Sequence, residues 1–164
     1  MGAGKTTVGR VVAERLGRAF VDTDELVEAT TGTTVTELFE QVGEARFREL
    51  ERIAIADACA SPEPLVIACG GGAVLDPENR RHLRATGYVV WLRASPAVLG
   101  ARVAGTATRP LLAGGASPTD TLERLDALRT PAYEAAAHAE VDTEGHSIDE
   151  VADAVVKGWS SWNG

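Results

Sequence analysis

The residues most clearly suited to chemistry lie at the start of the chain. Gly4-Lys5-Thr6 matches the end of the phosphate-binding pattern G-x-x-x-x-G-K-[ST]. Glycines let backbone N–H groups curl around phosphate oxygens, and the N-terminus of a following helix attracts the anion. Lys5 can reach the β- and γ-phosphates of a nucleotide, and the Thr6 hydroxyl can ligate Mg²⁺. The alternative interpretation is a glycine-rich segment before an ordinary helix.

The pattern lacks its N-terminal half. Its first glycine would lie five positions before Gly4, ahead of Met1, together with the buried strand that precedes such a loop. Unpaired buried backbone groups cost about 1–3 kcal/mol each, so losing that strand would offset much of a domain's stability of about 5–15 kcal/mol. We therefore expect the natural protein to begin about ten residues upstream, enough for a strand and the glycine.

Composition indicates one soluble domain with a sizeable core. The chain has 164 residues, 45% of them hydrophobic and 24% charged, with few aromatic residues and many alanines, which favours a helix-rich α/β protein. The net charge of −8 argues against nonspecific binding to nucleic acid or to an anionic membrane. An acidic protein that binds an anionic substrate must concentrate positive charge locally, so single arginines are of interest.

Cysteine content points to a reducing compartment. Cys59 and Cys69 are the two cysteines, and no apolar run is long enough to span a bilayer. Cys69 lies in an apolar run and is expected to be a small core residue. The sequence therefore predicts a cytoplasmic protein.

Short apolar runs alternate with segments of helical periodicity. Predicted strands cover residues 19–21, 65–69, 88–92 and 140–143. Predicted helices cover 7–16, 25–31, 35–39, 44–60, 76–85, a segment from 96, 121–137 and 149–162, with an interruption at Gly43 and a break or kink at Pro131. Residues 105–117 lack periodicity and are expected to form a mobile loop.

This alternation predicts the elements that must position the chemistry. Strands separated by helices favour an α/β fold with a parallel sheet and helices on both faces. Ligands in such folds bind beyond the carboxyl ends of the strands. Residues 22–24 (Asp-Thr-Asp) and 70–72 (Gly-Gly-Gly) fall at such ends. We therefore expect both segments to meet the phosphate loop in one cleft.

Six motifs in order resemble the shikimate kinase family. They are Gly2–Thr6, Asp22–Asp24, Phe47–Glu51, Gly70–Gly72, Thr108–Leu112 and Arg129–Tyr133. The resemblance implies a P-loop kinase-like three-layer fold in which the strand missing from this sequence is the first and central one. It also implies ATP-dependent phosphorylation of the 3-hydroxyl of shikimate to 3-phosphoshikimate, a step toward chorismate and the aromatic amino acids.

The two carboxylates after the first predicted strand suit different roles in such a reaction. Asp24 is the candidate for orienting the acceptor hydroxyl and taking its proton. Asp22 is suited to hold Mg²⁺ through water. If the chain is still extended there, both carboxylates point into one cleft. Alternatively, Asp24 caps a helix that begins at Glu25.

Arginine is the residue type for a substrate carboxylate, because its guanidinium donates two parallel hydrogen bonds. Arg48 and Arg129 match the family's carboxylate-binding arginines, and Glu51 can orient Arg48. The alternative for each arginine is a surface ion pair, for Arg48 with Glu44 or Glu51. The resemblance assigns a backbone contact with substrate to Gly71. A tight turn is the alternative for the triple glycine.

Two further arginines are assigned to the nucleotide by resemblance. Arg109 belongs to a lid loop over residues 105–118 that closes on the phosphates, and Arg102 lies against adenine. The chain departs from the family after Thr143, where a basic residue near adenine is missing. We therefore expect nucleotide affinity to depend more on the phosphate loop and on Arg102.

These inferences give one expected site in a single domain, residues 1–164, with a substrate-binding helical region at 24–60. The catalytic residues are Lys5, Asp24 and Arg109. The nucleotide contacts are Gly2, Ala3, Gly4, Lys5, Thr6, Thr7, Arg102 and Arg109. The substrate contacts are Asp24, Arg48, Gly71 and Arg129. The metal ligands are Thr6 and Asp22, for Mg²⁺ bound with ATP.

Other functions stay open on the sequence. A related small-metabolite kinase, such as a gluconate kinase, has the same architecture, but the two arginines, Asp24 and the triple glycine favour shikimate. A nucleotide-binding module without catalysis is a different class of function, and the missing strand is the one feature that supports it. We expect a monomer with a small-molecule substrate and with neither nucleic acid nor membrane as partner.

Overall fold

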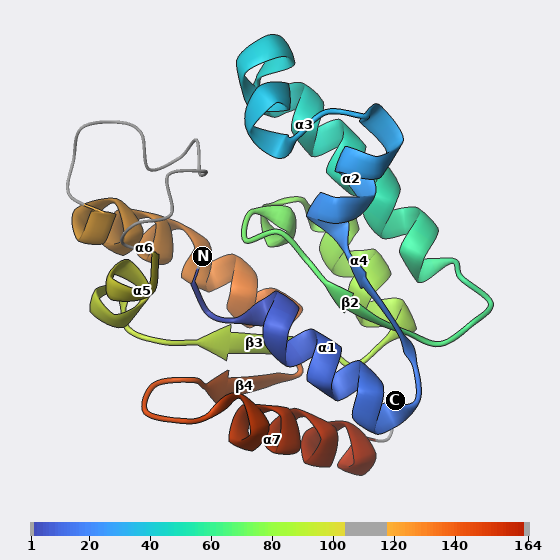
Figure 1. The fold of residues 1–164 in the computed structure, drawn as a ribbon, viewed down its shortest axis with the longest axis vertical. Coiled ribbons are helices and arrows are strands. Elements are labelled where there is room, and N and C mark those ends of the chain that lie inside the picture. Colours follow the sequence, from blue (N-terminus) through green and yellow to red (C-terminus); the bar gives the residue numbers. More distant parts are fainter. Residues whose placement is uncertain (1, 104–117, 163–164) are drawn as a thin grey trace.

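A computed structural model describes residues 2–103 and 118–162 of the chain (Figure 1). Its strands are β1 (Ala19–Asp22), β2 (Leu65–Ala68), β3 (Val90–Arg93) and β4 (Ala139–Asp142). Its helices are α1 (Lys5–Leu16), α2 (Thr23–Thr31), α3 (Val35–Cys59), the 3₁₀ turn η1 (Ala73–Leu75), α4 (Pro77–Thr86), α5 (Pro96–Val103), α6 (Pro118–Ala136) and α7 (Ile148–Ser161). The predicted α/β class is confirmed.

The described strands form two parallel pairs. β1 pairs with β2 from Ala19↔Leu65 to Asp22↔Ala68. β3 pairs with β4 from Val90↔Ala139 to Arg93↔Asp142. The expectation of parallel strands is confirmed, whereas within residues 2–103 and 118–162 the four strands do not join into one sheet.

Helices pack on the strand pairs and supply the core. One cluster joins Val8 and Val12 of α1 to Val151 and Ala152 of α7, in agreement with the apolar stripes of both segments. Figure 1 shows α7 along the bottom of the view and α1 above it. A second cluster, against which Cys69 packs, contains Ile55 of α3, Ala73 of η1 and Leu83 of α4. No described helix is long and apolar enough to cross a membrane.

The helices α2 and α3 form an arm at the top of Figure 1. Thr34 and the glutamate three residues later have the spacing of a capping box, and in the structure Thr34 caps α3 in this way with Glu37. Gly43 interrupts α3 with φ 80° and ψ 169°, a left-handed conformation that favours glycine, so the predicted interruption is confirmed. Phe47, just beyond that kink, is buried against Val27 and Leu38.

Two local predictions differ from the structure, and one segment cannot be compared. Helix α2 begins at Thr23 rather than at Glu25, because Asp22 caps it. Helix α6 runs through Pro131 as one helix, so the break that the sequence gave as one of two possibilities there is absent. The predicted lid loop, with Arg109, lies almost entirely at residues 104–117, outside the described residues.

Candidate active site

The phosphate loop leads directly into the first helix. Gly2 and Gly4 have φ of 74° and 81°, in the left-handed region where a side chain would be strained. Gly4 is the N-cap of α1 and contributes no side chain, so the first backbone N–H groups of the helix face outward toward an anion. Lys5 is the first residue of this helix. Loop and helix together have the backbone geometry that an anion site requires.

The hydroxyl of Thr6 is held by the carboxylate that ends β1. Thr6 Oγ1 donates to Asp22 Oδ2 at 2.8 Å, while Asp22 Oδ1 accepts from the backbone N–H of Asp24 at 3.0 Å. Two hard oxygen donors at this spacing suit Mg²⁺, which keeps several waters and takes the rest of its ligands from phosphates. Among the described residues no group of three or more His, Cys, Asp or Glu can hold a metal alone.

Asp24 lies against the triple glycine rather than beside Asp22. Its Oδ1 is 2.9 Å from the place a Cβ would take on Gly70, and the Gly70 N–H donates to Thr23 Oγ1 at 3.1 Å. Because the chain turns helical at Thr23, the premise that both carboxylates share one strand face is wrong. The alternative role of Asp24 as helix cap is also wrong, since Asp22 is the cap.

A buried glutamate connects Asp24 to Arg48. Glu51 is fully buried, and its Oε2 accepts from Arg48 Nη1 at 2.7 Å. Its Oε1, which lies against Gly70, has no hydrogen-bond partner among the described residues. Burial raises the pKa of Glu51 above its usual value, while the charge of Arg48 opposes that shift. Glu51 is thus a buried acid whose ionised form is stabilised by Arg48.

Arg48 pairs with Glu44 at the surface, which the sequence left open as an alternative, and it also pairs with the buried Glu51. Its Nη2 donates to the exposed Glu44 at 3.0 Å, opposite its bond to Glu51. Burial lowers the pKa of Arg48, but the neighbouring carboxylates outweigh it and the net shift is upward. A Cβ on Gly72 would lie 2.6 Å from Arg48 Cζ, so the glycine is required for this position of the guanidinium.

The second arginine comes from α6. Arg129 is 6% exposed, and its Nε has no hydrogen-bond partner in the described part of the chain. It acts electrostatically on Glu51, whose pKa it lowers. Two carboxylates and two guanidiniums, from residues 24, 48, 51 and 129, therefore share the space around the triple glycine. A buried guanidinium donor without a partner is suited to a ligand carboxylate.

Tyr133, one turn after Arg129, supports this loop, and the sequence did not single it out for that role. Its hydroxyl donates to the Gly71 carbonyl at 2.7 Å, and its ring stacks on Trp91 with centroids 5.1 Å apart. Burial raises the pKa of Tyr133, and the charge of Arg129 opposes the shift. The available signal was its place in the motif Arg129–Tyr133.

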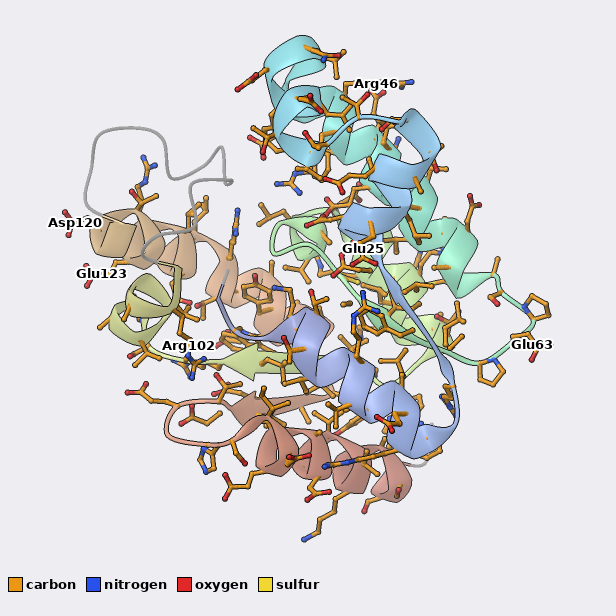
Figure 2. The ribbon with its side chains drawn as sticks, in the orientation of Figure 1. Glu25, Arg46, Glu63, Arg102, Asp120 and Glu123 are labelled. Atoms are coloured by element: carbon orange, nitrogen blue, oxygen red, sulfur yellow. The ribbon has the colours of Figure 1, made fainter. Side chains whose placement is uncertain are left out.

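Arg102 lies on the other side of the phosphate loop. Its guanidinium donates to the Thr143 carbonyl at 2.8 Å and to Thr143 Oγ1 at 2.9 Å. Figure 2 shows Arg102 at the carboxyl ends of β3 and β4. A cavity of about 220 Å³ adjoins it, lined by Gly2, Ala3, Gly4, Thr7, Val8, Arg102, Thr143, His146, Ser147, Ile148 and Val151. His146 is exposed, as expected for a surface turn.

A phosphate loop at the carboxyl ends of parallel strands, with a hydroxyl–carboxylate pair beside it, is the arrangement of P-loop phosphotransferases. The second half of the site, with its acidic and basic side chains around the glycines, is suited to a small anionic acceptor. Sequence and structure comparisons are consistent with this class.

The chain belongs to the shikimate kinase family, since the family model described as Shikimate kinase matches residues 1–159. A shikimate kinase of Symbiobacterium thermophilum is 51% identical over 92% of this chain and 87% of its own. One from Thiobacillus denitrificans is 45% identical over 90% and 80%. The range matched by the family model includes all the site residues described above.

Solved structures agree with the family. A shikimate kinase from Acinetobacter baumannii, in complex with shikimate, superposes with a TM-score of 0.94 at 37% identity, over 98% of this chain and 89% of that one. The corresponding enzyme of Bacteroides thetaiotaomicron gives a TM-score of 0.88 at 33% identity, over 98% and 94%. A gluconokinase from Sinorhizobium meliloti has a TM-score of 0.62 at 22% identity, over 98% and 87%, and shares the fold alone.

Proposed function

We propose that this protein transfers the γ-phosphoryl group of ATP to the 3-hydroxyl of shikimate, giving 3-phosphoshikimate and ADP. The observation that carries the proposal is the meeting of Asp24, Arg48 and Arg129 around the triple glycine, near the phosphate loop. An acceptor with one carboxylate and several hydroxyls matches this combination of guanidiniums, carboxylate and glycine backbone. The family membership supports the same substrate.

In the proposed reaction Asp24 accepts the proton of the 3-hydroxyl as its oxygen attacks the γ-phosphorus. The bond between that phosphorus and the β–γ bridging oxygen breaks, and ADP leaves with the electron pair. Arg48 and Arg129 bind the shikimate carboxylate, and the backbone of Gly71 contacts the substrate. Lys5 and the loop amides stabilise the charge on the transferring group. Arg109 is proposed as a further phosphate contact, outside the described residues.

Thr6 and Asp22 are proposed to hold the Mg²⁺ that accompanies ATP, and Arg102 to lie against adenine. The Mg²⁺, when bound, neutralises developing charge on the β- and γ-phosphates. Phosphate contacts come from the loop residues Gly2, Ala3, Gly4, Lys5, Thr6 and Thr7. Arg102, held by Thr143, lines the cavity of about 220 Å³ described above. Its positive charge there supports a nucleotide in this cavity.

The metal assignment predicts a large effect of Thr6→Val. The substitution keeps the shape of the side chain but removes the hydroxyl that Asp22 accepts from. We expect kcat to fall about 100-fold, the size of effect seen when one group that stabilises transition-state charge is lost. Thr30→Val is the matched control, since Thr30 is exposed and its hydroxyl donates to the Leu26 carbonyl within α2, with no assigned ligand contact. An equal loss in both variants, measured over a Mg²⁺ titration, would contradict the assignment.

Gly72→Ala is expected to act through Arg48. Gly72 has φ −99° and ψ −8°, which alanine adopts easily, so the cost is steric. The new methyl group would lie 2.6 Å from Arg48 Cζ, and Glu44 and Glu51 hold that guanidinium on either side. We expect the KM for shikimate to rise about tenfold, equivalent to about 1.4 kcal/mol of lost binding.

The control for this prediction is Gly87→Ala. Gly87 has an extended backbone and its Cβ would meet nothing closer than the Leu83 carbonyl at 3.9 Å. Steady-state kinetics with saturating ATP should leave its KM at the wild-type value. A wild-type KM in Gly72→Ala would show that the present position of Arg48 is not needed for binding.

The substrate assignment is tested with a panel of hydroxyl acceptors and ATP, measured as acceptor-dependent ADP release. Turnover of shikimate with little turnover of gluconate is expected, because gluconate has no ring to lie on the triple glycine. Substantial turnover of gluconate alone would replace the proposal with a gluconate kinase. ATP binding without turnover of any acceptor would indicate a nucleotide-binding module.

We also propose that the protein acts as a single-domain monomer in the cytoplasm, without nucleic acid or membrane partners. The net charge of −8 supports the absence of nucleic acid and membrane partners, since both carry negative charge. Light scattering of the purified protein tests the oligomeric state. A stable dimer at micromolar concentration would refute the monomer.

A further inference from the structure

The triple glycine forms a hydrogen-bonded turn after β2. The N–H of Ala73 donates to the carbonyl of Gly70 at 3.0 Å, which closes a turn of four residues. Gly72, the third residue of this turn, has φ −99° and ψ −8°. These angles are close to those of the third position in a type I turn, about −90° and 0°. Gly71 and Gly72 are therefore the two central residues, and the bond between them is the central peptide of the turn.

Glycine at the third position permits a second orientation of that peptide. A type II turn closes the same hydrogen bond but has its central peptide rotated by roughly 180°. It requires a φ of about +80° at the third residue, and glycine adopts a positive φ about as readily as a negative one. Gly72 has no side chain to oppose the change. A contact from outside the turn must therefore fix the orientation.

Side chains of two helices hold the ends of the turn. Thr23 Oγ1 of α2 accepts from the N–H of Gly70 at 3.1 Å. Asn79 of α4 is 1% exposed, and its Nδ2 donates to the Ala73 carbonyl at 2.9 Å. Neither contact involves the central peptide, so both are compatible with a type I and with a type II turn.

The central peptide is held by Tyr133 of α6. The Tyr133 hydroxyl donates to the Gly71 carbonyl at 2.7 Å, and its ring stacks on Trp91 at an interplanar angle of 12°. Burial raises the pKa of Tyr133, so the hydroxyl stays protonated and remains a donor at neutral pH. The carbonyl and the N–H of a trans peptide point in opposite directions. The N–H of Gly72 is therefore directed away from Tyr133.

This peptide borders the part of the site assigned to the acceptor carboxylate. Arg48 Cζ lies 2.6 Å from the place that a Cβ would take on Gly72. The buried Arg129 lies one helical turn before Tyr133 on α6. A backbone N–H in this position attracts an anion, whereas the carbonyl oxygen that a type II turn would place there repels it. The orientation of one peptide thus affects how well the site accepts a carboxylate.

We propose that the Tyr133 hydroxyl selects the type I orientation of the triple-glycine turn and so keeps the Gly72 N–H available to the acceptor. Tyr133 is then a positioning residue, which acts through the central peptide. Without the hydroxyl, part of the molecules adopt the type II orientation, and the apparent affinity falls with the fraction that remains in type I. This inference rests on the proposed function, since it assumes that the acceptor binds at these glycines.

Tyr133→Phe tests the inference, because it removes the hydroxyl and keeps the ring that stacks on Trp91. We expect the KM for shikimate to rise about fivefold to tenfold, as for the loss of one hydrogen bond, with kcat and the KM for ATP unchanged. Tyr88→Phe is the matched control, since the Tyr88 ring packs against His138 and Trp162. A wild-type KM in Tyr133→Phe, or an equal rise in both variants, would overturn the proposal.

The double variant Tyr133→Phe/Gly72→Ala distinguishes this role from a merely structural one. Alanine rarely adopts a positive φ, so Gly72→Ala excludes the type II turn. Gly72→Ala raises the KM by itself through Arg48, but adding Tyr133→Phe should then raise it no further. An equal proportional rise in both backgrounds would overturn the proposal and would indicate that Tyr133 acts by another route, such as the orientation of Arg129.

A crystal structure of Tyr133→Phe without acceptor gives a readout that does not depend on catalysis. The Gly71 carbonyl should turn away from the ring at position 133 in some or all of the molecules. A carbonyl in its present orientation, with water in place of the hydroxyl, would overturn the proposal. The proposed function fails separately, if the wild-type protein does not turn over shikimate, and this structure still decides which orientation Tyr133 selects.

Discussion

Asp24→Asn is expected to lower kcat for shikimate phosphorylation by about 10²- to 10⁴-fold, the usual contribution of a positioned general base. Asparagine has nearly the same shape but cannot accept the proton of the hydroxyl. The KM for ATP should change little, since Asp24 Oδ1 lies close to Gly70, in the half of the site assigned to the acceptor. Steady-state kinetics with each substrate varied in turn measures both parameters.

The same substitution should leave the free energy of unfolding nearly unchanged. Asp24 lies near the buried Glu51, whose pKa it raises, so removing one negative charge relieves repulsion. Glu25→Gln, next along the helix, is the matched control, because Glu25 is exposed and pairs with Arg10 on the surface (Figure 2). It should leave kcat unchanged. A large loss of stability in Asp24→Asn with activity retained would show that Asp24 has a structural role.

Arg48→Met is expected to damage both stability and substrate binding. The side chain of Glu51 is 1% exposed, and Arg48 is its hydrogen-bonded partner. Removing one partner of a buried ion pair leaves an uncompensated charge, and we expect a loss of about 3 kcal/mol, the lower end of the range, because Arg48 is 25% exposed. Denaturant titration measures this loss, and the KM for shikimate should rise at least about tenfold.

The double variant Arg48→Met/Glu51→Gln separates the two effects. A neutral amide at position 51 removes the buried charge, so most of the lost stability should return, while shikimate binding should stay weak because the guanidinium is still absent. Recovery of both properties would mean that Arg48 serves the fold alone. Recovery of neither would mean that the pair contributes through packing rather than charge.

The stability loss in Arg48→Met should depend on pH. Burial already raises the pKa of Glu51 in the folded protein, and loss of Arg48 removes the largest opposing influence, so this pKa rises further. An acid whose pKa is raised by folding stabilises the protein when protonated and loses that contribution as pH rises through the folded value. The difference between variant and wild type should therefore be small near pH 4.5 and grow toward neutral pH. A difference independent of pH would exclude the buried charge as its cause.

Local signals in the sequence predicted most elements correctly. The capping box at Thr34 and the glycine at position 43 act within one or two helical turns, and both appear as expected. Errors arose where neighbouring structure decides. Asp22 starts α2 early because its carboxylate caps the helix, and Pro131 lies within one continuous helix, α6, although a break was one of the two possibilities predicted there.

The sequence nominated candidate residues for the site but not their geometry. Motif spacing nominated Asp24, Arg48 and Arg129 together, and the structure brings them to the same glycines. No sequence motif predicted that Glu51 is buried with one oxygen that lacks a hydrogen-bond partner among the described residues. Nor did a motif predict the hydrogen bond from Tyr133 to the Gly71 carbonyl. Each depends on helices packing against a loop from another part of the chain, which periodicity does not encode.

What the sequence determined by itself is the phosphate loop, the order of strands and helices, and the family, because these depend on residue type and short spacing. The tertiary structure alone decided that Asp22 accepts from Thr6 while Asp24 lies close to Gly70, and that Glu51 is buried beside Asp24 and Arg48. It also decided that the described strands form two parallel pairs. The physical reason is that burial and hydrogen bonding between distant segments are set by how helices and strands pack, not by neighbours along the chain.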